Sequence, residues 1–97
     1  MPTAYNAFRT AVLALCDERA LAARLERAHA ALSDIDGANH LPEFLRFRFQ
    51  ELTDDIAYGA DSVGEALARM SRGDQERLVE RIVAMYGEVA RAMPSEA

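Results

Sequence analysis

The sequence predicts an all-α protein, a small helical bundle of four to five helices in a single domain over residues 1–97. Strand signals are nearly absent, because alanine is abundant whereas the β-branched residues that favour strands are few and scattered. Hydrophobic residues recur at intervals of three and four, which is the period of a helix with one buried face. Pro94 ends the last helix, so residues 94–97 are expected to fray. The expected helices cover residues 3–16, 18–34, 42–58, 62–70 and 72–93.

The first two expected helices have apolar stripes that point in different directions. At about 100° per residue, the stripe from Tyr5 to Leu15 lies roughly opposite the stripe from Leu21 to Ile35. Either the chain breaks near Asp17, which then caps the second helix, or one long helix presents two faces to two partners. The cap signal favours the break. The second stripe comprises Leu21, Leu25, Ala28, Leu32 and Ile35.

The remaining helices have clear start signals. Pro42 suits the first position of a helix. Ser62 and Glu65 form a capping box, and residues 71–74 cap the last helix. The stripes of these helices are Leu45, Phe49, Leu52 and Ile56, then Leu67 and Met70, and finally Leu78, Ile82, Met85, Val89 and Met93.

Charge and composition argue against several classes of partner. The net charge is −5, and 11 arginines are interspersed with 16 acids. We expect no nucleic-acid binding, because affinity for phosphate requires concentrated positive charge. We also expect no membrane association, since the longest apolar run, residues 11–16, is far too short to span a bilayer. The lone Cys16, the lack of a visible export signal and the absence of lysine predict a cytoplasmic bacterial protein.

A search for catalytic motifs finds none. The sequence lacks a Gly-rich phosphate loop, a Gly-x-Ser-x-Gly turn, a His-Glu-x-x-His pair and a Cys-x-x-Cys pair. Cys16 has no supporting histidine, because His29 and His40 fall in different predicted elements, and a single cysteine with apolar neighbours is typically an inert packed residue. We therefore expect no catalytic residue, no cofactor and no metal.

A surplus of apolar side chains suggests an interface. Phe44 and Phe47 lie off the main stripe of their helix, and Tyr5 and Phe8 add aromatic surface on the first helix. Exposed apolar patches mark association sites, so these four residues are interface candidates. The leading hypothesis is a non-enzymatic helical interaction module that binds itself as a homodimer, or binds another protein.

Residues 49–68 contain acids but no base. Glu51 and Asp55 share a helix face near its C-terminus, where both like charge and the helix dipole are unfavourable. A divalent cation or a basic partner would explain this arrangement. The plain interpretation is a solvated face, with Asp61 and Glu65 serving the next helix start. The acidic-patch candidates are Glu51, Asp54, Asp55, Asp61 and Glu65.

Two alternative functions stay open. A small metal- or ligand-binding protein would use segment 51–65 and His40, although the Glu-x-x-His pairs typical of metal sites in bundles are absent. A helix-turn-helix DNA binder would use the last two helices, against the acidic balance of the chain. Its candidate contacts are Arg69, Arg72, Arg77 and Arg81.

Overall fold

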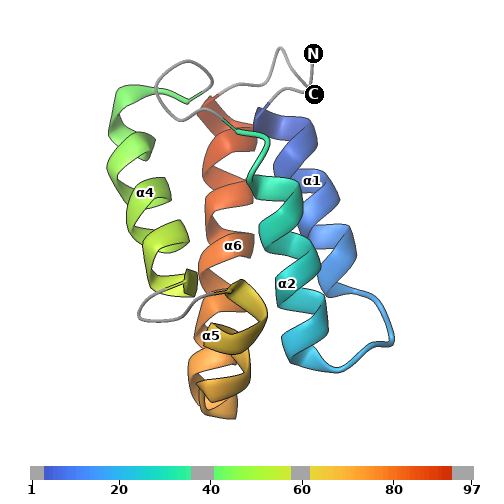
Figure 1. Ribbon diagram of the computed structural model, residues 1–97. Helices are drawn as coiled ribbons and strands as arrows, with labels where there is room; N and C mark the ends of the chain where they lie inside the picture. Colours follow the sequence, from blue (N-terminus) through green and yellow to red (C-terminus); the bar gives the residue numbers. More distant parts are fainter. Residues whose placement is uncertain (1–3, 36–40, 58–61, 93–97) are drawn as a thin grey trace.

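The computed structural model describes residues 4–35, 41–57 and 62–92. These ranges contain helices and no strand, which confirms the all-α prediction, and each helix agrees with its predicted range to within three residues. The predicted end at Pro94 and the frayed tail 94–97 lie outside the described residues. The helices are α1 (Ala4–Leu15), α2 (Leu21–Leu32), α4 (Glu43–Ala57), α5 (Val63–Arg69) and α6 (Arg72–Ala92) (Figure 1).

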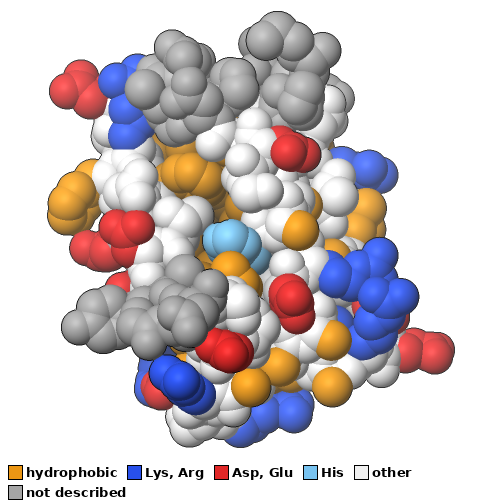
Figure 2. Space-filling model, viewed as in Figure 1, with side chains coloured by type: hydrophobic (Ala, Val, Ile, Leu, Met, Phe, Trp, Pro, Cys, Tyr) orange, Lys and Arg blue, Asp and Glu red, His pale blue; other side chains and the backbone are white. Residues whose placement is uncertain are grey.

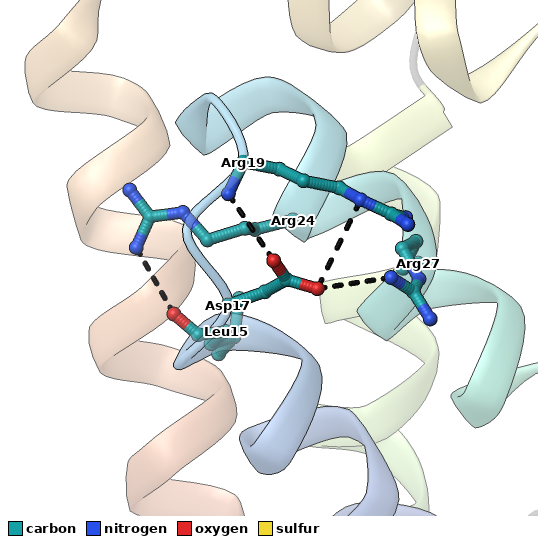
Figure 3. A network of polar contacts seen from close by, with 5 residues as sticks. All are labelled: Leu15, Asp17, Arg19, Arg24 and Arg27. Atoms are coloured by element: carbon teal, nitrogen blue, oxygen red, sulfur yellow. Dashed lines mark hydrogen bonds and ion pairs between the residues drawn. The ribbon is translucent and has the colours of Figure 1, made fainter.

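The chain breaks between α1 and α2 as predicted, but Asp17 is not the cap of α2. Ala20 occupies the N-cap position, and no side chain caps the helix there. The Asp17 carboxylate instead accepts a 3.3 Å hydrogen bond from the Arg19 backbone N–H and pairs with Arg27 at 3.0 Å (Figure 3). The predicted cap is therefore wrong, because Asp17 lies too far before the helix to reach its free amides. It joins the connection to the outer side of α2.

Arg24 provides a second link between the first two helices. Its Nη1 atom donates a 3.0 Å hydrogen bond to the carbonyl of Leu15, the last residue of α1 (Figure 3). That carbonyl has no partner within its own helix, so Arg24 satisfies a group that would otherwise depend on solvent. The bond fixes the end of α1 against α2.

Helix α6 is the central element of the bundle. It contacts α1 and α2 on one side and α4 on the other, while α5 contacts α2 and α4 (Figure 1). The core forms where the predicted stripes meet around α6. Within the described ranges, no helix combines the length and the apolar character needed to cross a membrane. The buried stripe residues include Leu21, Leu25, Ala28, Leu32, Leu45, Phe49, Leu52, Ile56, Leu67, Leu78, Ile82, Met85 and Val89.

The buried face of α1 differs from the predicted stripe. Alanines at positions 4, 7 and 11 are buried beside Phe8 and Leu15, whereas Tyr5 and Val12 are only partly buried. Small side chains allow helix axes to approach closely, because the distance between axes depends on the residues at the contact. Helix α1 is thus rotated relative to the prediction, so that the side carrying its alanines is the buried one.

The predicted helix starts are largely confirmed. The Ser62 hydroxyl accepts a 3.1 Å hydrogen bond from the Glu65 backbone N–H at the start of α5. Ser71 accepts an equivalent 3.1 Å bond from the Asp74 N–H at the start of α6. Helix α4 begins at Glu43, so Pro42 lies immediately before the helix and not at its first position.

Candidate interaction surface

The outer side of α4 exposes two phenylalanines. Phe44 is 62% exposed and Phe47 is 75% exposed, because the helix turns its other apolar residues into the core. We call the side that carries them the α4 face; it comprises Phe44, Phe47, Arg48, Glu51 and Asp55. Figure 2 shows hydrophobic and acidic side chains next to each other over α4, at the left edge of the molecule. This side of α4 therefore exposes large apolar side chains directly beside charged ones.

A groove runs between α4 and α6 beside the α4 face. One hollow of about 290 Å³ has an apolar floor that includes the buried Leu52 and Met85. A second hollow of about 320 Å³ lies further along the same two helices, and Arg81 lines both. The charged residues that line the first hollow are Arg48, Glu51, Glu80 and Arg81.

Ion pairs across this groove hold α4 to α6. Arg81 on α6 pairs with Asp55 on α4 at 2.9 Å. Arg48 on α4 lies 3.9 Å from the carboxylate of Glu88, which also accepts a 3.0 Å bond from Arg91. The first pair is close and direct, whereas the second is at the edge of ion-pair distance. Arg48 is therefore the more weakly held of the two arginines.

Only some of the acidic-patch candidates have an ion pair or a hydrogen bond that balances their charge. Asp55 has Arg81, and Asp54 accepts a 2.9 Å hydrogen bond from the Gln50 amide one turn earlier. Within the part of the chain that the structure describes, Glu51 makes no hydrogen bond or ion pair, and neither does Glu80 on the opposite lip of the groove. Glu65 is exposed at the start of α5, and Asp61 lies outside the described residues. The unfavourable placement of Glu51 thus remains unexplained by the chain itself.

The metal-binding alternative finds no ligand set in the described ranges. No group of three or more His, Cys, Asp or Glu side chains in residues 4–35, 41–57 and 62–92 has the arrangement needed to hold a metal ion. His40, the histidine assigned to that alternative, lies outside the described residues.

Three of the four arginines of the DNA-binding alternative already have acidic partners. On α6, Arg72 pairs with Glu76 at 3.1 Å, and Arg77 pairs with Asp74. Arg81 is bound to Asp55, and Arg69 also takes part in an interaction. A phosphate backbone would have to compete with these carboxylates, so the described surface supplies little free positive charge for DNA.

The aromatic candidates on α1 are placed differently from those on α4. Phe8 is fully buried and packs edge-on against Phe49, with ring centroids 6.1 Å apart. It belongs to the core and cannot contact a partner. Tyr5 is partly buried against Tyr86, whose hydroxyl donates a 3.2 Å hydrogen bond to it.

Two further apolar residues are exposed, although the sequence predicts Val83 as part of the widened stripe of the last helix. Leu13 on α1 is 55% exposed and Val83 on α6 is 47% exposed. Leu13 is spaced by three and four residues from the exposed Arg9, Thr10 and Cys16, whereas Val83 is spaced in this way from the partly buried Val79 and Tyr86. They are less exposed than Phe44 and Phe47, and they are isolated on their own helices.

Cys16 is exposed in the connection after α1, so its interpretation as a packed residue is wrong. The helix ends one residue earlier, which leaves its side chain outside the apolar face. His29 on α2 is half-buried, and burial lowers its pKa from the ordinary value. Neither residue belongs to the α4–α6 groove.

Comparison with protein-family models, with curated proteins and with solved structures finds no match to this chain.

Proposed function

We propose that this chain is a non-enzymatic helical interaction module that associates with a second copy of itself through the α4 face. The observation that carries the proposal is the exposure of Phe44 and Phe47 one turn apart on the same helix. Large aromatic side chains contribute strongly to interface energies, and contiguous exposed apolar patches mark association sites. A partner that covers both rings would remove them from water.

The balance of charge on this face supports self-association over binding to a surface of one sign. The face carries the cation Arg48 and the anions Glu51 and Asp55, of which Asp55 is already paired with Arg81. A face that carries both charges can complement itself when two copies are related by a twofold axis. A cation of one copy can then meet an anion of the other, and the symmetry forms the same contact twice.

The proposal also includes a reducing, cytoplasmic setting. Cys16 is exposed and has no second cysteine with which to form an intrachain disulfide. In an oxidising compartment such a thiol would cross-link copies in an uncontrolled manner.

The test is the molar mass of the chain in solution, measured by sedimentation over about 1 to about 100 micromolar, because association depends on concentration. We expect the wild-type chain to shift from monomer to dimer within this range. Phe44→Asp and Phe47→Asp should each keep the chain monomeric, since an acid at the centre of an apolar contact is left buried without a partner.

Leu13→Asp is the matched control, because Leu13 is also more than half exposed but lies on α1. It should leave the monomer–dimer equilibrium unchanged, and circular dichroism should show all three variants folded. A wild-type chain that stays monomeric throughout the range would refute the proposal. Dimers that persist in both Phe variants would refute the assignment to the α4 face.

A further inference from the structure

Two carboxylates on opposite sides of the α4–α6 groove have no positive partner. Glu51 on α4 and Glu80 on α6 both line the groove, and within the described residues neither makes a hydrogen bond or ion pair. The floor between them includes the buried Leu52 and Met85. A long cationic side chain entering here would pack its methylenes on this floor and bring its charge to the carboxylates.

Arg48 on the same α4 face is a cation of this kind. Its own partner, Glu88, is 3.9 Å away and is shared with Arg91, which binds that carboxylate at 3.0 Å. The Arg48 side chain is about half exposed, so moving it away from Glu88 loses only a weak, solvent-screened pair. Arg48 does not pair with Glu51 on its own helix, where the order of cation before acid is the less favourable one.

We propose that a second copy of the chain docks with its α4 antiparallel to the first and crossing midway between Arg48 and Glu51, so that Arg48 of each copy enters the α4–α6 groove of the other and pairs with Glu51. The inference rests on the self-association proposed above and specifies its geometry. The two copies are related by a twofold axis, so the ion pair forms twice.

The spacing along α4 fits this crossing. Phe47 and Arg48 lie just before the crossing, Glu51 lies just after it, and Phe44 lies one turn before Phe47. In an antiparallel pair, residues before the crossing on one helix meet residues after it on the other. Arg48, before the crossing, therefore meets Glu51 of the other copy, after it, and the Phe47 rings of the two copies flank the axis.

An antiparallel arrangement also places the acids of α4 more favourably. Glu51, Asp54 and Asp55 lie in the C-terminal half of the helix, where its own dipole opposes negative charge. In the proposed dimer, the N-terminal half of the other α4 lies beside them, with the positive end of its dipole. A parallel pair would instead bring the acids of the two copies together.

A charge swap tests this geometry. Arg48→Glu alone and Glu51→Arg alone each put like charges across the interface, so we expect dimerisation to weaken by at least about tenfold in each. The double variant Arg48→Glu/Glu51→Arg restores an opposite pair with reversed polarity. We expect its dissociation constant, measured by sedimentation, to return to within about threefold of the wild-type value.

Arg9→Glu and Glu18→Arg serve as controls, because they make the same changes of net charge at exposed positions outside α4. They should leave the dissociation constant unchanged. A double variant that dimerises no better than the single variants refutes the Arg48–Glu51 contact. If Phe44→Asp still dissociates the dimer in that case, the proposed function stands and only this geometry fails. A monomeric wild-type chain overturns both proposals.

Discussion

The side-chain amide of Gln75 donates a 2.8 Å hydrogen bond to the backbone carbonyl of Leu67 and so joins the start of α6 to α5. Gln75 is the polar residue buried in the core of the described ranges. The Leu67 carbonyl also accepts a 3.2 Å bond from the Met70 N–H, so it retains one partner if Gln75 is replaced. The amide, by contrast, depends on this carbonyl to offset its burial.

Substitutions of Gln75 should separate the hydrogen bond from the packing. Gln75→Met keeps the length of the side chain, and we expect it to lower the free energy of unfolding by only about 1 kcal/mol. Gln75→Glu places a carboxylate against a carbonyl oxygen, so we expect a loss of about 2 to 4 kcal/mol at neutral pH. Urea denaturation measures both values. Equal losses in the two variants would show that the bond is unimportant.

Gly87→Ala should stabilise the chain. Gly87 lies in the interior of α6, and an added Cβ would meet only Arg91 Nη1, at an ordinary contact distance of 3.7 Å. Replacing an interior helical glycine by alanine contributes about 1 kcal/mol, which raises the Tm of a small domain by about 4 to 8 °C.

Gly64→Ala is the comparison for this prediction. A Cβ at Gly64 would lie 3.3 Å from Oε2 of Glu26, so that carboxylate must shift to accommodate it. We expect a smaller rise in Tm than for Gly87→Ala. The reverse order in thermal denaturation would contradict the close approach of α5 to α2 at this point.

The stability of the chain should decrease in mildly acidic solution because of His29. Burial lowers the pKa of His29 below its ordinary value of 6.5, so the unfolded chain takes up this proton more readily than the folded chain. The contribution of His29 is therefore complete above pH 6.5 and is lost as the pH falls toward the lower pKa of the folded state. His29→Gln should show a smaller decrease in Tm between neutral and mildly acidic pH than the wild type.

Asp17 provides the contrast, because its effect belongs to a lower pH range. Although burial raises the pKa of Asp17, hydrogen bonds from the Glu18 and Arg19 amides and the charges of Arg19 and Arg27 lower it overall from 3.8. The contribution of Asp17 to the stability of the folded state is complete above pH 3.8 and is lost only in more acidic solution. Asp17→Asn should therefore leave the decrease between neutral and mildly acidic pH intact. An unchanged decrease in His29→Gln would contradict the role of His29.

The helices and most of the core could be predicted from the sequence because each follows from a local signal. Spacing of three and four identified the buried face of α6, and Ser62 and Ser71 marked helix starts that their hydroxyls do cap. Asp17 misled the prediction, because a carboxylate near a helix start can bind an arginine as readily as a backbone amide. Only the fold decides between these two partners.

The candidate surface could be predicted only in part. The off-stripe positions of Phe44 and Phe47 followed from the period of the helix, and the structure finds both exposed. The α4–α6 groove and the pairing of Asp55 with Arg81 depend on how two helices distant in sequence pack together, which periodicity does not specify. Gln75 was missed for the same reason, since its partner is a backbone carbonyl on another helix.

The contact between Tyr5 and Tyr86 should make the chain sensitive to alkaline pH. Their ring centroids are 5.6 Å apart, and the Tyr86 hydroxyl donates a 3.2 Å hydrogen bond to Tyr5. This bond raises the pKa of Tyr86 above its ordinary value of 10, assisted by burial and by the charge that Tyr5 can acquire, against an opposing effect of Arg9. The folded state holds the proton of Tyr86 more tightly than the unfolded state does. The stability that this adds is complete below pH 10 and is lost as the pH rises through the higher pKa of the folded state.

Tyr5→Phe removes the acceptor while keeping the ring. We expect the ultraviolet titration of Tyr86 to move toward lower pH in this variant, because the bond that held its proton is gone. Tyr86→Phe should show a smaller decrease in Tm at alkaline pH than the wild type, because the group that titrates is then absent. A Tyr86 titration that does not move in Tyr5→Phe would assign the raised pKa to burial alone, and the link between the two ends of the chain would then rest on ring packing.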